Sequence, residues 1–298
     1  MVQVAKLGHI ALNTPNLESL LAYYTDVLGF SVTERSGDGE VYLSTDVDHH
    51  NVILYPGTQT GIRHVAFQLG EGLALRDAES QLRDLGIKVT SMTDAQPGIV
   101  EILEFADPEG YIVQLYQSIA QAPDVLLAPE KPIRPQKIGH VALRAQDVQG
   151  MAEFYQSVLG FRVSDWMGDF FVFMRCGPDH HTINFLHSPQ HTMQHVAFQV
   201  ANWASIESAC DHLAKHNISL IWGPGRHGIG HNIFTYHLDP DNNIVELFTE
   251  LDIMLNEELG YFEPRPWHED VPQKPKVWEP SLATSNKWGA GPPEIMMQ

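Results

Sequence analysis

The chain repeats itself, and this duplication limits its possible folds more than any other feature of the sequence. Residues 6–32 and 137–163 align at a constant offset of 131, with 11 of the 27 positions identical. The same offset aligns RHVAFQL at 63–69 with QHVAFQV at 194–200. A repeat of this length predicts that the two halves are copies of one structural unit of about 130 residues.

A shorter repeat lies inside each half. His9 and His64 are 55 residues apart, and so are His140 and His195. Each half therefore reads as a pair of related modules, which gives four modules in the chain.

The sequence of one module predicts a strand, then a helix, then several strands. Residues 139–145 alternate and are rich in small and branched side chains, as is typical of a strand. Apolar residues then recur at helical spacing, between Asp147, which can cap the start of a helix, and Gly160, which can end it. Residues 161–176 and 181–188 read as further strands joined by turns. We therefore expect an α+β fold.

Proline-rich composition separates the two halves. The segment 119–136 is rich in proline and predicts a linker. We expect an N-terminal domain over residues 1–118 and a C-terminal domain over residues 137–251. Residues 252–298 contain many prolines and tryptophans without a clear period, so we expect a tail that packs on the C-terminal domain.

The composition argues against several classes of partner. Asp and Glu number 37 against 18 Lys and Arg, and the resulting net charge of -19 repels nucleic acid and anionic lipid. Only two cysteines, Cys176 and Cys210, occur, which argues against a disulfide framework. No apolar run is long enough for a signal peptide or a membrane span. We expect a cytoplasmic protein with neither nucleic acid nor membrane as a partner.

Three residues of the second half have the chemistry of a metal site. His140, His195 and Glu246 each lie in an alternating segment, namely GHVAL, QHVAF and IVELF. Alternation places His140 on the same strand face as Ala142, and His195 on the same face as Ala197, so we expect this face to be buried. A buried carboxylate is costly unless it is paired or bound to a metal. Two imidazoles and one carboxylate form the facial triad of non-haem iron(II) oxygenases, although manganese, zinc and nickel accept the same ligands.

The first half supplies an internal comparison for this triad. At an offset of 132, ADPEGYIVQLY at 106–116 aligns with LDPDNNIVELF at 238–248, so Gln114 stands where the second half has Glu246. A neutral amide is a poor ligand for a divalent metal, which predicts that the first half has lost its site. The alternative is that the triad is only two core histidines and a hydrogen-bonded glutamate.

These motifs resemble the two-domain extradiol (type I) ring-cleavage dioxygenases of the vicinal oxygen chelate superfamily, most closely the catechol 2,3-dioxygenases. The most specific stretch is residues 223–248, in which His227 lies nine residues before Tyr236, and Tyr236 ten before Glu246. The family also places a histidine about 14 residues before the second metal histidine, a position that His181 matches. The likeness extends over both halves to about residue 250.

The resemblance implies a fold, a metal and a reaction. Each domain would consist of two βαβββ modules that form a barrel-like mixed sheet, with a single Fe(II) in the C-terminal domain. The enzyme would use O2 to cleave a catechol or substituted catechol beside the diol, giving a 2-hydroxymuconic semialdehyde type of product. A homotetramer is the assembly that the family suggests. The alternatives are a divalent-metal isomerase or lyase of the same superfamily, and a protein that only binds an aromatic compound.

The residues that match the family positions take roles from their chemistry. We expect His181 to be the acid–base group, with His180 as the alternative, because a neutral imidazole can accept and return a proton. His180 is otherwise expected to bind the substrate. Tyr236 is expected to donate to a substrate oxygen, and His227 to orient the substrate. Pocket walls are expected at two positions, Phe173 and Ile229.

The sequence departs from some family members at two positions. Ala142 stands where some have asparagine, and Gly230 where others have aspartate, so the polar surroundings of the site differ. The remaining histidines are expected at solvated turns and helix surfaces, or in a polar loop. Apart from His268, they are His187, His191, His212, His216, His231 and His237, with His49 and His50 in the loop.

Overall fold

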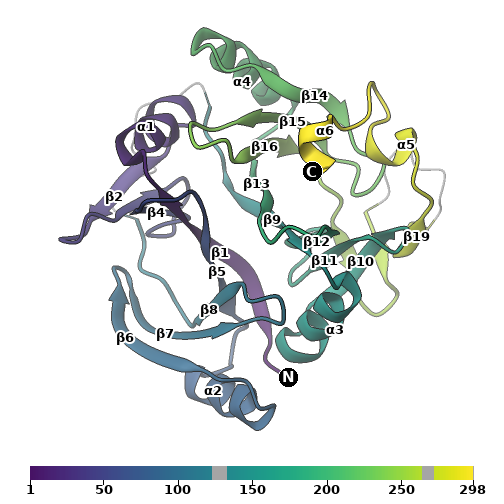
Figure 1. Ribbon diagram of the computed structural model, residues 1–298. Helices are drawn as coiled ribbons and strands as arrows, with labels where there is room; N and C mark the ends of the chain where they lie inside the picture. Colours follow the sequence, from purple (N-terminus) through teal and green to yellow (C-terminus); the bar gives the residue numbers. More distant parts are fainter. Residues whose placement is uncertain (123–132, 264–271, 298) are drawn as a thin grey trace.

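The protein forms two curled mixed sheets that share one topology. The computed structural model describes residues 1–122, 133–263 and 272–297. The N-terminal half of the chain builds an eight-stranded sheet and the C-terminal half a nine-stranded sheet. In Figure 1 the two halves lie beside each other, with the longer helices on the outside of the sheets.

The N-terminal domain contains two modules, each with a strand, a helical segment and three strands. The first module contains β1 (Val4–Thr14), α1 (Leu17–Ala22), the π-helix η1 (Tyr23–Val27), β2 (Ser31–Arg35), β3 (Val41–Ser44) and β4 (Val52–Pro56). The second contains β5 (Gly61–Leu69), α2 (Leu75–Asp84), β6 (Thr90–Gln96), β7 (Ile99–Ala106) and β8 (Ile112–Tyr116).

The C-terminal domain repeats this order. Its first module contains β9 (Lys137–Ala145), α3 (Val148–Leu159), β10 (Arg162–Met167), β11 (Phe171–Arg175) and β12 (Ile183–His187). Its second contains β13 (Met193–Gln199), α4 (Trp203–Lys215), β14 (Leu220–Arg226), β15 (Ile233–Leu238) and β16 (Ile244–Thr249).

The strand order shows the duplication directly. The N-terminal sheet runs β2-β3-β4-β1-β5-β8-β7-β6. Read in the same direction, and apart from a ninth strand added at the β10 edge, the C-terminal sheet runs β10-β11-β12-β9-β13-β16-β15-β14. In each sheet the first strands of the two modules pair antiparallel at the centre, and each also pairs in parallel with the last strand of its own module. The expected α+β fold of two βαβββ modules per domain is confirmed.

Local signals in the sequence explain where elements begin and end. Helix α3 begins after Asp147, whose side chain accepts a hydrogen bond from the backbone N–H of Gly150. It ends at Gly160, which has φ 72°, a conformation that glycine adopts without steric cost.

The C-terminal tail packs on the C-terminal sheet and adds to it. The elements of the tail are β17 (Met254–Asn256), β18 (Tyr261–Phe262), β19 (Lys276–Trp278), α5 (Leu282–Ser285) and α6 (Glu294–Met297). Strand β19 pairs in parallel with β10 at the sheet edge, and in Figure 1 α5 and α6 lie close to β14 and β15. Much of the expected linker 119–136 falls on residues 123–132, and part of the expected tail on 264–271 and 298, which lie outside the described residues.

One large apolar core spans the two domains. It includes Phe67 of β5 and Tyr155 of α3, which are in edge-to-face contact with ring centroids 6.5 Å apart. Hydrogen bonds also join the halves, such as the one between the Tyr23 hydroxyl and Nε2 of His237 at 2.6 Å. Among the described residues, no helix has both the length and the apolar character needed to cross a membrane.

Candidate metal centre

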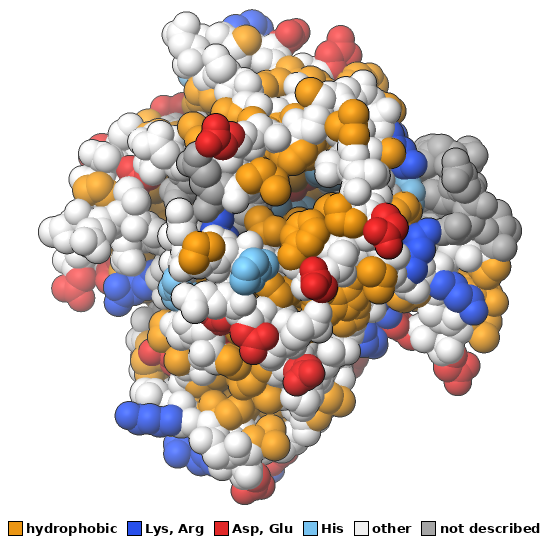
Figure 2. Space-filling model, turned by 45° about the vertical axis from the view of Figure 1, so that its right-hand side comes forward, with side chains coloured by type: hydrophobic (Ala, Val, Ile, Leu, Met, Phe, Trp, Pro, Cys, Tyr) orange, Lys and Arg blue, Asp and Glu red, His pale blue; other side chains and the backbone are white. Residues whose placement is uncertain are grey.

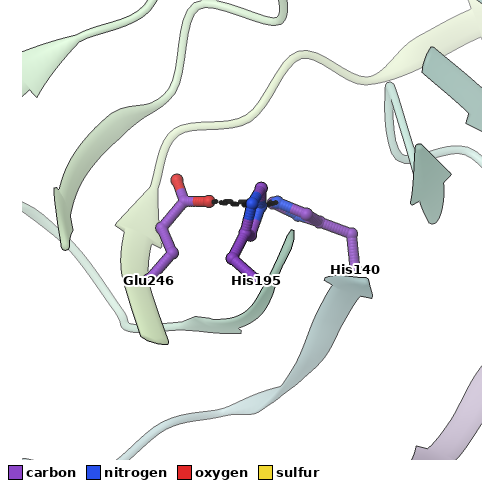
Figure 3. A group of neighbouring side chains, drawn as sticks. All are labelled: His140, His195 and Glu246. Carbon is purple, nitrogen blue, oxygen red and sulfur yellow. Dashed lines mark hydrogen bonds and ion pairs between the residues drawn. The ribbon is translucent and has the colours of Figure 1, made fainter. Parts of the chain in front are cut away.

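Three side chains from three neighbouring strands converge on one point of the C-terminal sheet. Figure 3 shows His140 from β9, His195 from β13 and Glu246 from β16 pointing toward one another. Nε2 of His140 lies 3.0 Å from Nε2 of His195 and 3.0 Å from Oε2 of Glu246, and Nε2 of His195 lies 3.3 Å from the same oxygen. All three residues are buried, with at most 4% of any of them exposed. They are therefore the kind of group that can hold a metal ion.

The strand register explains this convergence. Ala197 of β13 pairs with His140 on one side and with Glu246 on the other. The next strand, β15, places Tyr236 opposite Glu246. His195 lies two positions before Ala197 and thus on the same face. Because Ala197 ends in a methyl group, space remains above it between the three ligands.

The donor atoms fit a divalent metal. Neighbouring ligand atoms around an octahedral ion with bonds of ~2.1 Å lie ~3.0 Å apart, which matches the spacing found here. Two imidazole nitrogens and one carboxylate oxygen on one face leave the opposite positions open. Hydrogen bonds hold two of the ligands in orientation. Nδ1 of His195 bonds Oε1 of Gln194, and Nδ2 of Asn232 donates to Oε1 of Glu246 at 2.9 Å.

The pKa shifts of Glu246 and His195 favour the binding of a cation. Burial alone raises the pKa of Glu246, but His140 and His195 outweigh it and hold that pKa well below its usual range. Burial lowers the pKa of His195, an effect that Glu246 opposes. The glutamate is therefore an anion and His195 a neutral imidazole near pH 7.

The triad lies in a cavity of about 220 Å³. Its wall also includes His181, His227, Tyr236, Phe173 and Ile229. Figure 2 shows a face of the molecule on which hydrophobic side chains gather around a hollow, with histidine side chains visible inside it.

The two adjacent histidines of the sequence occupy different places. His181 is in the wall of the cavity, and its ring centroid lies 4.2 Å from that of His140. His180 is fully buried and does not line the cavity. Its Nδ1 is 2.9 Å from Nδ1 of His181, and its Nε2 is 3.0 Å from Oδ2 of Asp165. His180 therefore does not line the cavity as expected, because His181 and Asp165 occupy both of its ring nitrogens.

His227 and Tyr236 form a second hydrogen-bonded pair on the wall. The carbonyl oxygen of Ser285 can only accept, so His227 donates from Nδ1 to it at 2.6 Å. Nε2 of the neutral His227 ring then accepts from the Tyr236 hydroxyl at 3.0 Å. Burial lowers the pKa of His227 to about 4, against the opposing charge of Glu246. Burial, followed by the charge of Glu246, raises the pKa of Tyr236 well above its usual value, so the phenol keeps its proton.

Sequence reasoning missed three residues that support the site, namely Asp165, Gln194 and Asn232. Asp165 had a detectable signal, because at an offset of 131 the first half has another acidic residue, Glu34. Gln194 and Asn232 had no such signal, since amides next to a ligand strand are common in any sequence.

The expectation of solvated histidines is wrong at two positions. His231 is buried and bonded to Oδ2 of Asp252 at 2.7 Å. His237 is fully buried beside Tyr23. His49 and His50, expected in a polar loop without a carboxylate partner, are buried beside Tyr42, and Nε2 of His49 lies 3.6 Å from Oε2 of Glu34.

The N-terminal domain contains the matching positions without the carboxylate. His9 and His64 are buried, and their ring centroids are 5.3 Å apart, compared with 5.1 Å for His140 and His195. Gln114, at the position of Glu246, donates from Nε2 to Oε2 of Glu104 at 2.8 Å and accepts from Nε2 of Gln96 at 2.8 Å. Among the described residues, only the C-terminal three form a group with metal-ligand spacing.

Comparison with known proteins agrees with the duplication and the site. The family model of the Glyoxalase/Bleomycin resistance protein/Dioxygenase superfamily matches residues 6–115 and again residues 137–247. The chain belongs to this superfamily. The family resemblance expected from the sequence is thereby confirmed, and each of the two matches covers one domain of this superfamily member.

Known proteins are similar to this chain over most or nearly all of its length. A protein of Geobacillus genomosp. 3 named manganese-dependent 2,3-dihydroxybiphenyl 1,2-dioxygenase is 27% identical, over 93% of this chain and 94% of its own length. A metapyrocatechase of Pseudomonas sp. (strain CF600) is 27% identical, over 82% of this chain and 86% of its own. The crystal structure of a Mn(II)-bound glyoxalase from Novosphingobium aromaticivorans superposes with a TM-score of 0.84 at 26% identity, covering 99% of this chain and 94% of that one.

Proposed function

We propose that this chain is an extradiol dioxygenase that cleaves the ring of a catechol-type substrate with O2 at a mononuclear iron(II) held by His140, His195 and Glu246. The observation that carries the proposal is the combination of a facial three-ligand set and an apolar cavity with His181, His227 and Tyr236 in one wall. The names of the two curated relatives, both ring-cleaving dioxygenases, support the same reaction class.

Each residue of the wall has a task that follows from its chemistry. When bound, the metal supplies Lewis-acid activation of the diol and electron exchange with O2. Burial, followed by the charge of His140, lowers the pKa of His181, so this residue is a neutral base that can take a proton from a substrate hydroxyl and return it later. Tyr236 keeps its proton, which Nε2 of His227 accepts in this structure, so it can donate to a substrate oxygen by turning that proton away from His227. His227 holds the Tyr236 hydroxyl in place and is itself held by Ser285.

The lining of the cavity indicates the kind of ring substituent. The triad is buried, whereas the lining residues Met167, Phe170 and Phe171 are half-buried and Met297 is 56% exposed. The cavity therefore leads from a polar, buried end to an apolar end at the surface. None of its described lining residues is Lys or Arg. A carboxylate packed against these apolar side chains would lose part of its hydration without gaining a cation, so we propose a substrate whose substituent is uncharged.

The central experiment is anaerobic loading with iron(II), followed by oxygen uptake with a panel of catechols. We expect one O2 consumed per catechol and a yellow product. Catechols with alkyl or phenyl substituents should exceed 3,4-dihydroxyphenylacetate in kcat/KM by ~10-fold or more. If iron-loaded protein binds catechols without consuming O2, the dioxygenase proposal fails. If it cleaves the carboxylate substrate best, only the substituent proposal fails.

The metal requires its own test, because the Geobacillus relative is named for manganese. Iron(II) is our proposal on the basis of the ligand set and the family resemblance. Reconstitution of metal-free protein with either ion, followed by oxygen uptake, decides between them. Higher turnover with manganese than with iron would identify manganese as the cofactor.

A metal-dependent isomerase is the second candidate. One observation favours it, namely the similarity to a structure described as a Mn(II)-bound glyoxalase. An isomerase needs no O2, so conversion of a substrate under strict anaerobiosis would support this alternative over the dioxygenase.

Three further expectations remain predictions. They are the homotetramer, which light scattering after size-exclusion chromatography measures, the cytoplasmic location, and the domain limits at residues 118, 136 and 251. Limited proteolysis tests these limits, with cleavage expected first between the two domains.

A further inference from the structure

His181 is the first member of a buried chain of three side chains. Its Nδ1 faces Nδ1 of His180 at 2.9 Å, and Nε2 of His180 faces Oδ2 of Asp165 at 3.0 Å. The other oxygen of Asp165 accepts the backbone N–H of Lys276 at 2.8 Å. At most 4% of His181, His180 or Asp165 is exposed, so water does not compete for these bonds.

The hydrogen-bond roles in this chain follow from Asp165. A carboxylate can only accept, so His180 donates from Nε2. When the His180 ring carries one proton, that proton is on Nε2, so Nδ1 of His180 accepts and His181 must donate to it from its own Nδ1. The lone pair of His181 is therefore on Nε2. This ring nitrogen takes no part in the hydrogen bonds to His180 and Asp165 and is left to face the cavity.

We infer that Asp165 and His180 are positioning residues that fix the tautomer of His181, so that Nε2 presents its lone pair to a substrate hydroxyl. The inference rests on the proposed dioxygenase function of His181. In the step itself the O–H bond of the substrate breaks and an N–H bond forms at Nε2 of His181. The positive charge of the resulting imidazolium is stabilised through His180 by the negative charge of Asp165, which does not itself take the proton.

Gly230 lies next to both histidines of this hydrogen-bonded chain. A Cβ atom added to Gly230 would lie 3.3 Å from Nδ1 of His180 and 3.4 Å from Cε1 of His181. Because Gly230 has no side chain, no polar group from this position competes with His180 for His181.

The N-terminal domain contains a looser copy of the chain. Nδ1 of His50 faces Nδ1 of His49 at 3.1 Å, and Nε2 of His49 lies 3.6 Å from Oε2 of Glu34. The Glu34 side chain is 48% exposed, compared with 2% for that of Asp165. Glu34 is thus the matched control for Asp165, in the same strand position but outside the proposed site.

The substitution Asp165→Asn tests the inference because it reverses each hydrogen bond with little change in shape. The Lys276 N–H continues to need an acceptor, so the amide oxygen should remain there and the amide NH2 should face His180. His180 must then accept at Nε2 and donate from Nδ1, and His181 must accept at Nδ1. The proton of His181 moves to Nε2, which removes the base.

We expect kcat of Asp165→Asn to fall by ~100-fold or more, while KM, metal content and Tm stay close to those of the wild type. Asp165→Glu, which keeps the carboxylate, should recover part of kcat. His180→Gln can accept from Nδ1 of His181 through its amide oxygen, so it should retain more activity than His180→Leu. Glu34→Gln should leave kcat unchanged. A kcat of Asp165→Asn within twofold of the wild type overturns the inference.

A second measurement does not depend on the reaction. In metal-free full-length protein, 15N chemical shifts of the His181 ring report which nitrogen carries the proton, and the His181→Ala variant identifies the signals. We expect the proton on Nδ1 in the wild type and on Nε2 in Asp165→Asn. The same tautomer in both proteins refutes the positioning role, whereas absence of catechol cleavage with the expected tautomers refutes only the proposed function.

Discussion

The two domains place histidines at the same strand positions but surround them differently. In the C-terminal domain, the carboxylate of Glu246 lies close to the imidazoles of His140 and His195. Each of the three side chains directs one ligand atom toward a common centre. In the N-terminal domain, the amide of Gln114 is occupied on both sides by Gln96 and Glu104. Neither ring nitrogen of buried His9 has a hydrogen-bond partner among the described residues.

This difference shows which features of the metal site both domains share and which belong to the C-terminal domain alone. The paired central strands bring two histidines together in both domains, as ring-centroid distances of 5.3 and 5.1 Å show. The charge of the third residue differs, and so does the residue opposite it, which is Tyr236 in one domain and Glu104 in the other. A metal site in this sheet therefore depends on one carboxylate at one strand position.

The largest contrast should come from substitution of that third residue. Glu246→Gln removes the only anionic ligand of the triad, so we expect metal affinity to fall by ~100-fold or more and oxygen uptake to be lost. Gln114→Ala should leave both unchanged. Metal analysis after dialysis, together with oxygen uptake, measures the effect. Equal losses in the two variants would contradict the assignment of the site to one domain.

A second contrast concerns the histidines beside each site. We expect His181→Ala to lower kcat by ~100- to 10,000-fold while iron content and substrate affinity persist, because the proton acceptor is gone. His50→Ala, the matched change in the N-terminal domain, should leave kcat unchanged per folded molecule. Steady-state kinetics with parallel iron determination measure both. An unaltered kcat in His181→Ala would remove its role as a base.

A second metal site can also be built into the N-terminal domain by substitution. Gln114→Glu alone would place a carboxylate against that of Glu104, so the companion change Glu104→Gln restores a donor between them. With His9 and His64 in place, we expect the double variant to bind close to two Mn(II) ions per chain, compared with one in the wild type. Titration calorimetry gives the stoichiometry. A value that stays at one would mean that the N-terminal strands hold their histidines too far apart for a metal.

Much of the fold and the triad could be predicted because the two halves of the chain can be aligned with each other. The offset of 131 fixed both the modules and the equivalence of His9 with His140, and the family motif at 223–248 located His227 and Tyr236. The helix over 148–159 followed from its periodicity and its two caps. These signals are local or periodic, so they are visible without coordinates.

The support of the site could not be predicted in the same way. Asp165 lies 15 residues before His180, and only the pairing of β10, β11 and β12 brings the two together. Helices α5 and α6 belong to a tail without a hydrophobic period, yet Ser285 and Met296 line the cavity. Burial of His231 and His237 likewise depends on partners distant in sequence, Asp252 and Tyr23.

The smallest expected effect concerns a feature that the two domains share. Asp107 and Asp239 occupy equivalent turns before β8 and β16, and in each the carboxylate accepts backbone N–H groups of its own turn. Burial raises the pKa of both carboxyls to about 6, from an ordinary value of 3.8. The folded state therefore binds protons more tightly than the unfolded state between these values. The stability that these groups contribute is full below about pH 4 and is lost as the pH rises through about 6.

If the duplication preserves this electrostatic environment, both domains should respond alike. Between pH 5 and pH 7 each aspartate should lower the free energy of unfolding by ~1–2 kcal/mol. Asp107→Asn and Asp239→Asn cannot titrate, so each variant should lose less stability than the wild type over this interval, by similar amounts. Urea unfolding at the two pH values measures the difference in slope and is insensitive to a constant cost of the substitution. A response in one variant alone would show that the turns differ in solvation despite their equivalent positions, and that the divergence of the two domains extends beyond the metal positions.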